Sequence, residues 1–226
     1  MKQRFVVLFL LGACTAWSIG LGVGGFGGIA IPTGAMGDED DPGNEDWDAS
    51  NLGNSPAFGG KFLVEVMPLL ELEAAVAYHT GHPYKDWEDT PGIEEPFVTL
   101  VPITFGANVK YLTGPLGVYG GAGLGYYLEN TEITGVVETP FGDIPFKAEA
   151  DANGLGLYLS GGVLFNFGDF AVDVNPRYHY IMNEGTIDYT MEAEFEGFHW
   201  SETESVDKDF NDTYVDIRAG VDYFFM

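Results

Sequence analysis

The chain has 226 residues, of which 46% are hydrophobic and 15% aromatic, a composition that excludes a disordered polymer. It carries 35 Asp and Glu against 9 Lys and Arg, for a formal net charge of −26, which excludes nucleic acid as a partner because phosphate binding needs a basic face. The one cysteine, Cys14, excludes a disulfide framework, a cysteine-rich zinc site and an iron–sulfur cluster.

The N-terminus is predicted to be a targeting segment. A short basic start precedes an apolar run and then small residues, so residues 1–16 fit a secretory signal peptide that is cleaved after Ala16. The alternative is a lipoprotein signal, with cleavage before an acylated Cys14. No later stretch offers the ~20 consecutive apolar residues of a membrane helix.

Residues 17–226 are divided by glycine, proline and acidic clusters into eight segments in which apolar and polar residues alternate, a pattern that predicts β-strands. The expected strands cover residues 17–31, 57–67, 70–80, 96–111, 117–128, 153–167, 169–183 and 213–225. Pro102 and Pro176 fall inside strands and cannot donate to a ladder, so β-bulges are expected there.

The links between these strands alternate between long and short, which is typical of a barrel with tight turns at one end and large loops at the other. The sequence therefore predicts an all-β fold, an eight-stranded antiparallel up-and-down transmembrane β-barrel. Its four long acidic loops are expected on the cell exterior and both termini on the periplasmic side.

Each expected strand has one oily face and one polar face, because successive side chains point to opposite sides. The polar faces are rich in glycine, which suits a narrow interior. The oily faces carry aromatic residues in two bands, as membrane-interface girdles do. We expect the oily faces to contact lipid and the polar faces to line the lumen. A soluble, lipocalin-like barrel with an oily cavity is the alternative.

Ten charged residues fall on the faces that are expected to line the lumen. They are Lys61, Glu65, Glu71, Glu73, Lys110, Asp173, Arg177, Asp216, Arg218 and Asp222. An unpaired charge in a dry interior is costly, so each of the four basic residues should meet at least one carboxylate. Eight strands enclose a space that side chains nearly fill, so the sequence predicts a plugged lumen with a structural ion-pair network.

The C-terminal stretch RAGVDYFF resembles the barrel-assembly signal of outer-membrane proteins. Arg218, Gly220, Tyr223 and Phe225 match its polar, glycine and two aromatic positions. The stretches GPLGVYGGAGLGYY and GFGGIAIPTG are similar to parts of the small OmpW- and OmpA-type barrels. The resemblance implies a monomer in the bacterial outer membrane that contacts its lipids, lipopolysaccharide and the barrel-assembly machinery.

The acidic run DEDDPGNEDWD contains the carboxylates that could bind a divalent cation, namely Asp38, Asp40, Asp41, Glu45 and Asp46. Pro42 and Ala49 occupy positions that an EF-hand loop needs for other residues. We therefore expect loose binding of Ca²⁺ or Mg²⁺ at most, no specific metal site and no cofactor. Adaptation to a saline habitat is the alternative explanation of the acidity.

Two histidine-containing groups are candidate chemical sites. His79 and His82 lack a third metal ligand nearby in the sequence. Ser160 and His179, with Asp173 or Asp216, could form a nucleophilic triad, but a nucleophile sealed in the lumen cannot reach a lipid ester. No catalytic residue is therefore expected.

The sequence predicts a non-enzymatic barrel of the cell envelope that has a structural or surface-interaction role. The first alternative is an OmpW-like conduit for small hydrophobic molecules, which an apolar trough through the wall would favour. The second alternative is a lipid-modifying barrel enzyme.

Overall fold

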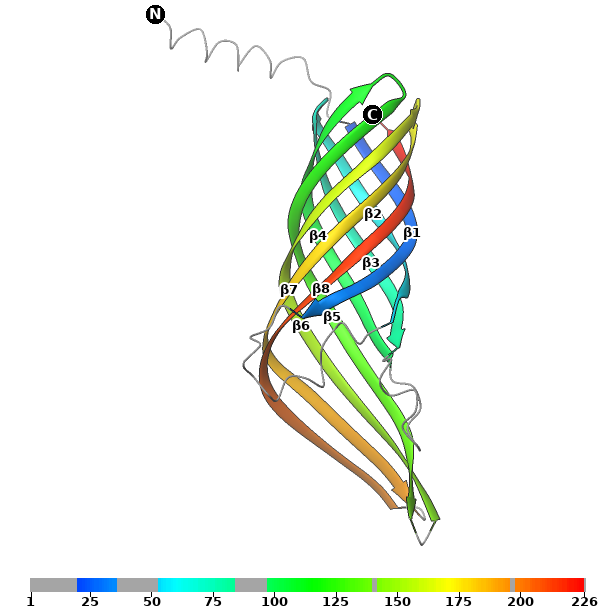
Figure 1. Cartoon of the computed structure of the whole chain (residues 1–226), viewed down its shortest axis with the longest axis vertical. Helices are drawn as coiled ribbons and strands as arrows, with labels where there is room; N and C mark the ends of the chain where they lie inside the picture. The colour runs from blue at the N-terminus through cyan, green and yellow to red at the C-terminus, as the bar shows by residue number, and fades with distance from the viewer. Residues whose placement is uncertain (1–19, 36–52, 84–96, 140–141, 196–197, 226) are drawn as a thin grey trace, which may run out of the picture.

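The computed structural model describes residues 20–35, 53–83, 97–139, 142–195 and 198–225. Its strands are β1 (Gly20–Ala35), β2 (Ser55–Met67), β3 (Leu70–Pro83), β4 (Phe97–Thr113), β5 (Leu116–Thr139), β6 (Gly142–Phe167), β7 (Phe170–Phe195) and β8 (Phe198–Phe225). They pair antiparallel in chain order, and β8 closes on β1 (Figure 1). The predicted eight-stranded up-and-down barrel is confirmed.

One end of the barrel carries the tight turns. The turns β2–β3, β4–β5 and β6–β7 each have two residues between strands and gather at the end where the C-terminus lies (Figure 1). Gly114 and Gly168 occupy two of these turns at φ +68° and +76°, the left-handed region that glycine enters without steric cost. Glycine therefore occupies the positions in the β4–β5 and β6–β7 turns where the backbone needs a positive φ.

At the other end, four strands run well past the barrel. The segments 133–139, 142–151, 188–195 and 198–211 of β5 to β8 form what we call the projecting sheet. It begins near the last pair of β5 with β4, at Glu132, and the last pair of β8 with β1, at Asp212 (Figure 1). Residues 129–152 and 184–212 were expected to be long loops. In the structure, their described parts instead belong to β5, β6, β7 and β8. Their acids alternate with apolar or small residues, so the segments keep the period of a strand.

The barrel accommodates its prolines without the expected bulges. The register is the same on both sides of Pro102 in the β4–β5 ladder and of Pro176 in the β7–β8 ladder, so the prediction at these two positions was wrong. Each proline lacks a donor toward only one neighbouring strand, and the ladder passes it without an extra residue. A register shift occurs instead at Pro32, between Pro32 and Gly34 of β1.

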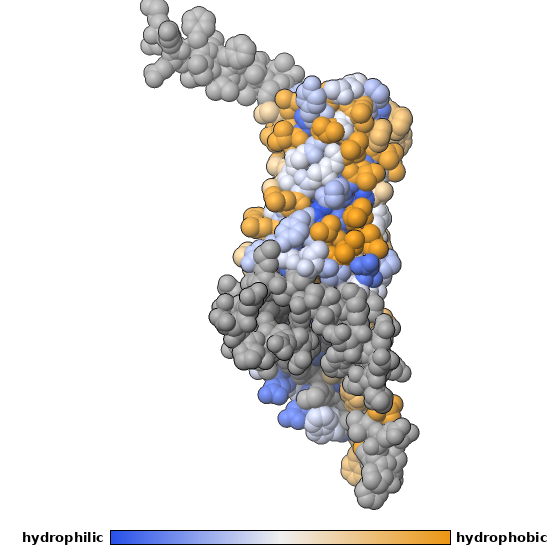
Figure 2. Space-filling model, viewed as in Figure 1, coloured by the Kyte–Doolittle hydropathy of each residue, from blue (hydrophilic) through white to orange (hydrophobic). Residues whose placement is uncertain are grey.

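The two faces of the wall have opposite chemistry. Apolar side chains such as Phe105, Leu157 and Val221 are exposed on the outside, where Figure 2 shows patches of hydrophobic residues over the barrel. Most of the alternate residues point inward and are buried or half-buried. No helix in the described ranges is long and apolar enough to cross a membrane.

Inward glycines make room for inward tyrosine rings. A Cβ at Gly106 or Gly123 would lie 2.2 Å or 2.4 Å from atoms of the Tyr158 side chain. A Cβ at Gly125 or Gly156 would likewise meet the ring of Tyr127, at 2.5 Å and 2.7 Å. The glycine-rich polar faces therefore fit large side chains into a narrow lumen.

Alanine at Gly123 is expected to destabilise the barrel by about 1–3 kcal/mol, because the new methyl group would overlap the carbonyl oxygen of Phe105 and the Tyr158 ring. Alanine at Gly120, on the outer face of the same strand, should change stability little, since its Cβ approaches nothing closer than 3.8 Å. Urea unfolding of both variants in lipid vesicles measures the difference. Equal losses would contradict the assignment of the faces.

Candidate functional site

One part of the lumen is built around Lys61 of β2. Its Nζ lies 3.0 Å from Asp173 Oδ1 of β7 and 3.0 Å from Asp222 Oδ1 of β8. The Tyr119 hydroxyl of β5 donates to the other oxygen of Asp173 at 2.8 Å. Separate walls of the barrel are thus joined through one buried ammonium group.

Arg177 of β7 forms a deeply buried ion pair with Glu73 of β3. Its two terminal nitrogens contact the two carboxylate oxygens at 2.6 Å and 2.9 Å, and both side chains are 2% exposed. Arg177 Nε donates to Asn175 Oδ1 at 2.8 Å, and the guanidinium lies 5.2 Å from the ring centroid of Tyr158. This bidentate arrangement fixes both groups, because the planar fork matches the carboxylate.

Lys110 of β4 lies nearer the tight-turn end. It pairs with Glu71 and, at 3.0 Å, with Glu65 Oε1. Asn108 donates to Glu71 at 3.3 Å and to Glu73 at 3.5 Å, which connects this group to Arg177. Asn175 in turn donates to Tyr119, so the three cationic groups belong to one continuous network.

Asp216 of β8 is the centre of a second cluster. Arg218 pairs with it, and the guanidinium carbon lies 4.5 Å from the ring centroid of Phe26. The Nε2 atoms of His79 and His179 each lie 3.5 Å from an Asp216 oxygen. His179 Nδ1 is 2.8 Å from the Tyr127 hydroxyl, so both ring nitrogens of His179 face polar groups.

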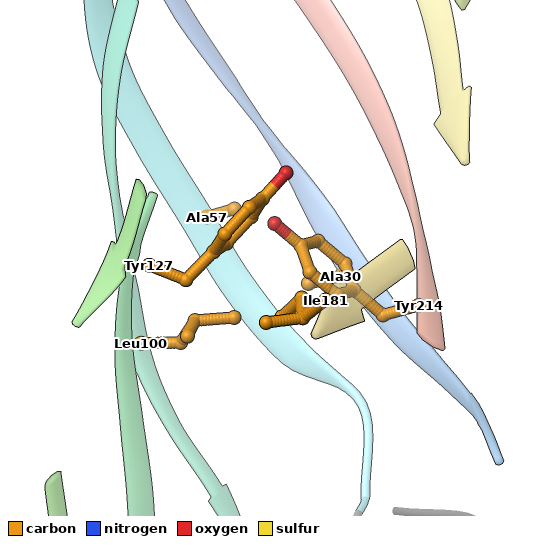
Figure 3. Close-up of a cluster of buried hydrophobic side chains, with 6 residues drawn as sticks. All are labelled: Ala30, Ala57, Leu100, Tyr127, Ile181 and Tyr214. Carbon is orange, nitrogen blue, oxygen red and sulfur yellow. The ribbon is translucent and has the colours of Figure 1, made fainter. Parts of the chain in front are cut away.

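An apolar layer caps this cluster on the side toward the projecting sheet. It consists of Ala30, Ala57, Leu100, Tyr127, Ile181 and Tyr214, contributed by six strands (Figure 3). The hydroxyls of Tyr127 and Tyr214 point to the same side, away from Leu100 and Ile181 (Figure 3). Tyr214 stacks on the His179 ring with centroids 4.3 Å apart. The two tyrosines therefore join the apolar layer to the polar cluster.

The structure brings all ten of the predicted lumen residues into ion pairs. Each of the four basic side chains, Lys61, Lys110, Arg177 and Arg218, contacts at least one of the six carboxylates. On β8, Arg218 and Gly220 face inward, whereas Tyr223 and Phe225 are on the outer wall with ring centroids 6.1 Å apart. The four residues that resemble the assembly signal thus divide between the two faces.

The other candidate sites are not assembled in this way. Ser160 Oγ lies within hydrogen-bond distance of Asn108 Oδ1, at 3.4 Å, and His179 contacts Asp216 instead. The candidate cation loop, residues 38–46, and the side chain of His82 lie outside what the structure describes. Within the described ranges, no group of three or more His, Cys, Asp or Glu is arranged to hold a metal ion.

Sequence reasoning missed the neutral members of the network. Tyr119, Tyr127, Asn108 and Asn175 connect charged groups that come from different strands. Their inward positions could have been found from strand alternation, since Tyr119 and Tyr127 have the same parity as the inward glycines of β5. Their hydrogen-bond partners across the barrel could not have been found from the sequence, because the choice of partner depends on the tilt of the strands.

The projecting sheet carries a charged group on its surface. Lys147 Nζ lies 3.2 Å from Glu132 Oε1 and 2.5 Å from Glu149 Oε1. Hydrogen bonds from Lys147 to Glu149 and Glu132 raise the pKa of the lysine. Because the lysine side chain is 39% exposed, this three-residue group is a solvated surface cluster and not a buried site.

The fold of this chain is similar to that of solved outer-membrane proteins. Neisserial surface protein A superposes with a TM-score of 0.54 at 14% identity, covering 91% of this chain and 97% of that one. A major outer membrane protein from Thermus thermophilus gives a TM-score of 0.57 at 14% identity, covering 92% and 100%. The chain folds as a small eight-stranded outer-membrane barrel. Its sequence matches no protein-family model and no curated protein.

Proposed function

We propose that the protein is a non-enzymatic outer-membrane barrel with a closed, charged lumen and an acidic surface for interactions. The observation that carries this proposal is the pairing of every inward basic side chain described. Lys61, Lys110, Arg177 and Arg218 are no more than 8% exposed, and each contacts a carboxylate. These four described basic groups are therefore already occupied by carboxylates and are not free to act on a substrate.

The packing of the lumen supports a structural role over the two alternatives. A conduit for hydrophobic molecules needs an apolar path, but Ala30, Tyr127 and Ile181 are at most 1% exposed where the apolar layer crosses the lumen. A lipid-modifying enzyme needs a nucleophile beside the lipid. Ser160 lies on the inner face, separated from lipid by the barrel wall.

The same proposal specifies the partners of the protein and its orientation in the outer membrane. The apolar outer face contacts outer-membrane lipid and lipopolysaccharide, and β8 with Arg218, Gly220, Tyr223 and Phe225 is the strand that the barrel-assembly machinery recognises. The protein acts as a monomer whose projecting sheet lies outside the cell and whose tight turns are periplasmic. Carboxylates on the exterior end bind Ca²⁺ or Mg²⁺ loosely, because crowded like charges favour divalent counterions.

Cysteine labelling in intact cells tests this orientation. Ser201→Cys in the projecting sheet and Asp169→Cys in the β6–β7 turn each replace an exposed residue at opposite ends of the barrel. A membrane-impermeant maleimide is expected to label the first variant in intact cells and the second only after the outer membrane is opened. The reverse pattern would overturn the proposed topology, and recovery of unlabelled soluble protein would overturn the membrane location.

A further inference from the structure

Among the strand pairs that the structure describes, the outermost part of β8 has a partner on one side. Residues 198–204, which we call the β8 tip, pair with residues 189–195 of β7 without a register shift. β1 pairs with β8 only as far as Asp212, so among the described pairs no strand lies on the other side of the tip. All residues of the tip are exposed. Thr203 has a further interaction, so the inference rests on Phe198, Trp200, Glu202 and Glu204.

The tip lacks most of the features that normally protect a sheet edge. Natural edges are blunted by lysine, proline, bulges or covering segments, because an open edge is a template for another strand. The tip sequence FHWSETE contains no lysine, proline or glycine, and its register is continuous. It does contain acids, Glu202 and Glu204, which repel an acidic strand and attract a basic one.

On one face of the tip, the side chains change from aromatic to acidic along the strand. Phe198 and Trp200 are 80% and 49% exposed, and Glu202 and Glu204 follow at the next alternate positions. Strand alternation places these four on the same side, with His199 and Ser201 on the other. A strand that adds here meets two aromatic residues at the outer end and two carboxylates nearer the barrel.

The negative charge of the chain indicates which class of partner the edge of the β8 tip could bind. A second copy of this chain also carries a net charge of −26, so pairing of two tips would oppose like charges. An anionic membrane surface is repelled for the same reason. A basic strand is attracted, and cross-strand pairs of opposite charge stabilise a sheet, whereas like pairs destabilise it.

We propose that the β8 tip binds an extended, basic polypeptide segment as an added strand. The segment would place apolar residues opposite Phe198 and Trp200 and Lys or Arg opposite Glu202 and Glu204, with main-chain hydrogen bonds supplying affinity and the side chains specificity. This inference deepens the proposed surface role and rests on it for access to the partner. The strand addition itself is a property of the sheet.

The experiment uses the full-length protein in lipid nanodiscs and a fluorescent peptide of about ten residues, with valines alternating with threonines in one half and lysines alternating with threonines in the other. Anisotropy at about 0.15 M salt is expected to show saturable binding. An analogue of this peptide N-methylated at alternate residues, which has the same charge but lacks donors on one edge, should bind at least about tenfold more weakly. Equal binding of the two peptides, or no binding of either, would overturn the proposal.

A matched pair of double variants locates the contact on one face. E202Q/E204Q and H199K/S201K both change the net charge by about two units, on opposite faces of the tip. The first is expected to weaken binding about threefold to tenfold and the second less than about twofold. Equal weakening would show attraction to overall charge and not strand addition. Because the nanodisc exposes both ends of the barrel, this result is independent of the labelling test in cells.

Discussion

Replacement of Arg177 by methionine is expected to lower the free energy of unfolding by about 3–5 kcal/mol, because it leaves Glu73 buried without its cation. Glu73 is 2% exposed and cannot recover the lost hydrogen bonds from bulk water. The neighbouring Lys61 is occupied by two other carboxylates. Urea unfolding of the barrel in lipid vesicles measures the loss.

The double variant Arg177→Met with Glu73→Leu tests whether these two residues contribute to stability as a coupled pair. We expect it to recover most of the stability lost in the single variant, since both charges are removed together. Lys147→Met, at an exposed ion pair, is the control and should change stability little. A double variant as unstable as the sum of its singles would contradict the account of Arg177 and Glu73 as a coupled pair.

Arginine at Leu157 is expected to impair insertion by about 2–4 kcal/mol, because this outward side chain, 48% exposed, lies in the apolar band of β6. Arginine at Asp151 is the matched control: it lies on the same strand and the same face, at the rim of the barrel where the projecting sheet begins. The folded fraction recovered in vesicles measures both. Equal impairment at the two positions would contradict the placement of the membrane boundary between them.

The period of two along the strands is the reason that the fold could be predicted. One-residue alternation in segments such as 170–182 and 214–225 determines which side chains share a face, whatever the neighbouring strand is. The inward placement of Lys61, Arg177 and Asp216 follows from this rule alone. The residue at which a strand ends does not follow from this rule, because acids at alternate positions are compatible with both a loop and a solvated sheet. The segments 129–152 and 184–212 were therefore expected to be loops.

The contacts inside the lumen were only partly accessible from the sequence. Complementary charges on inward faces indicate that pairs form, but the choice of partner depends on the tilt of the strands, which brings residues distant in sequence to one level. The approach of His79 and His179 to the same carboxylate, Asp216, joins three strands in this way. Neutral side chains such as Asn108 give no charge signal, so their bridging positions require the folded barrel.

Planar-bilayer recording of the purified barrel at neutral pH is the most direct test of the central claim, that a paired and packed lumen closes the barrel. Every described lumen cation is held by a carboxylate, and Ala30, Tyr127 and Ile181 of the apolar layer are at most 1% exposed. We therefore expect insertion of the protein with little or no stable ion conductance. A steady current of the size carried by a porin would contradict the closed lumen and favour a role in transport.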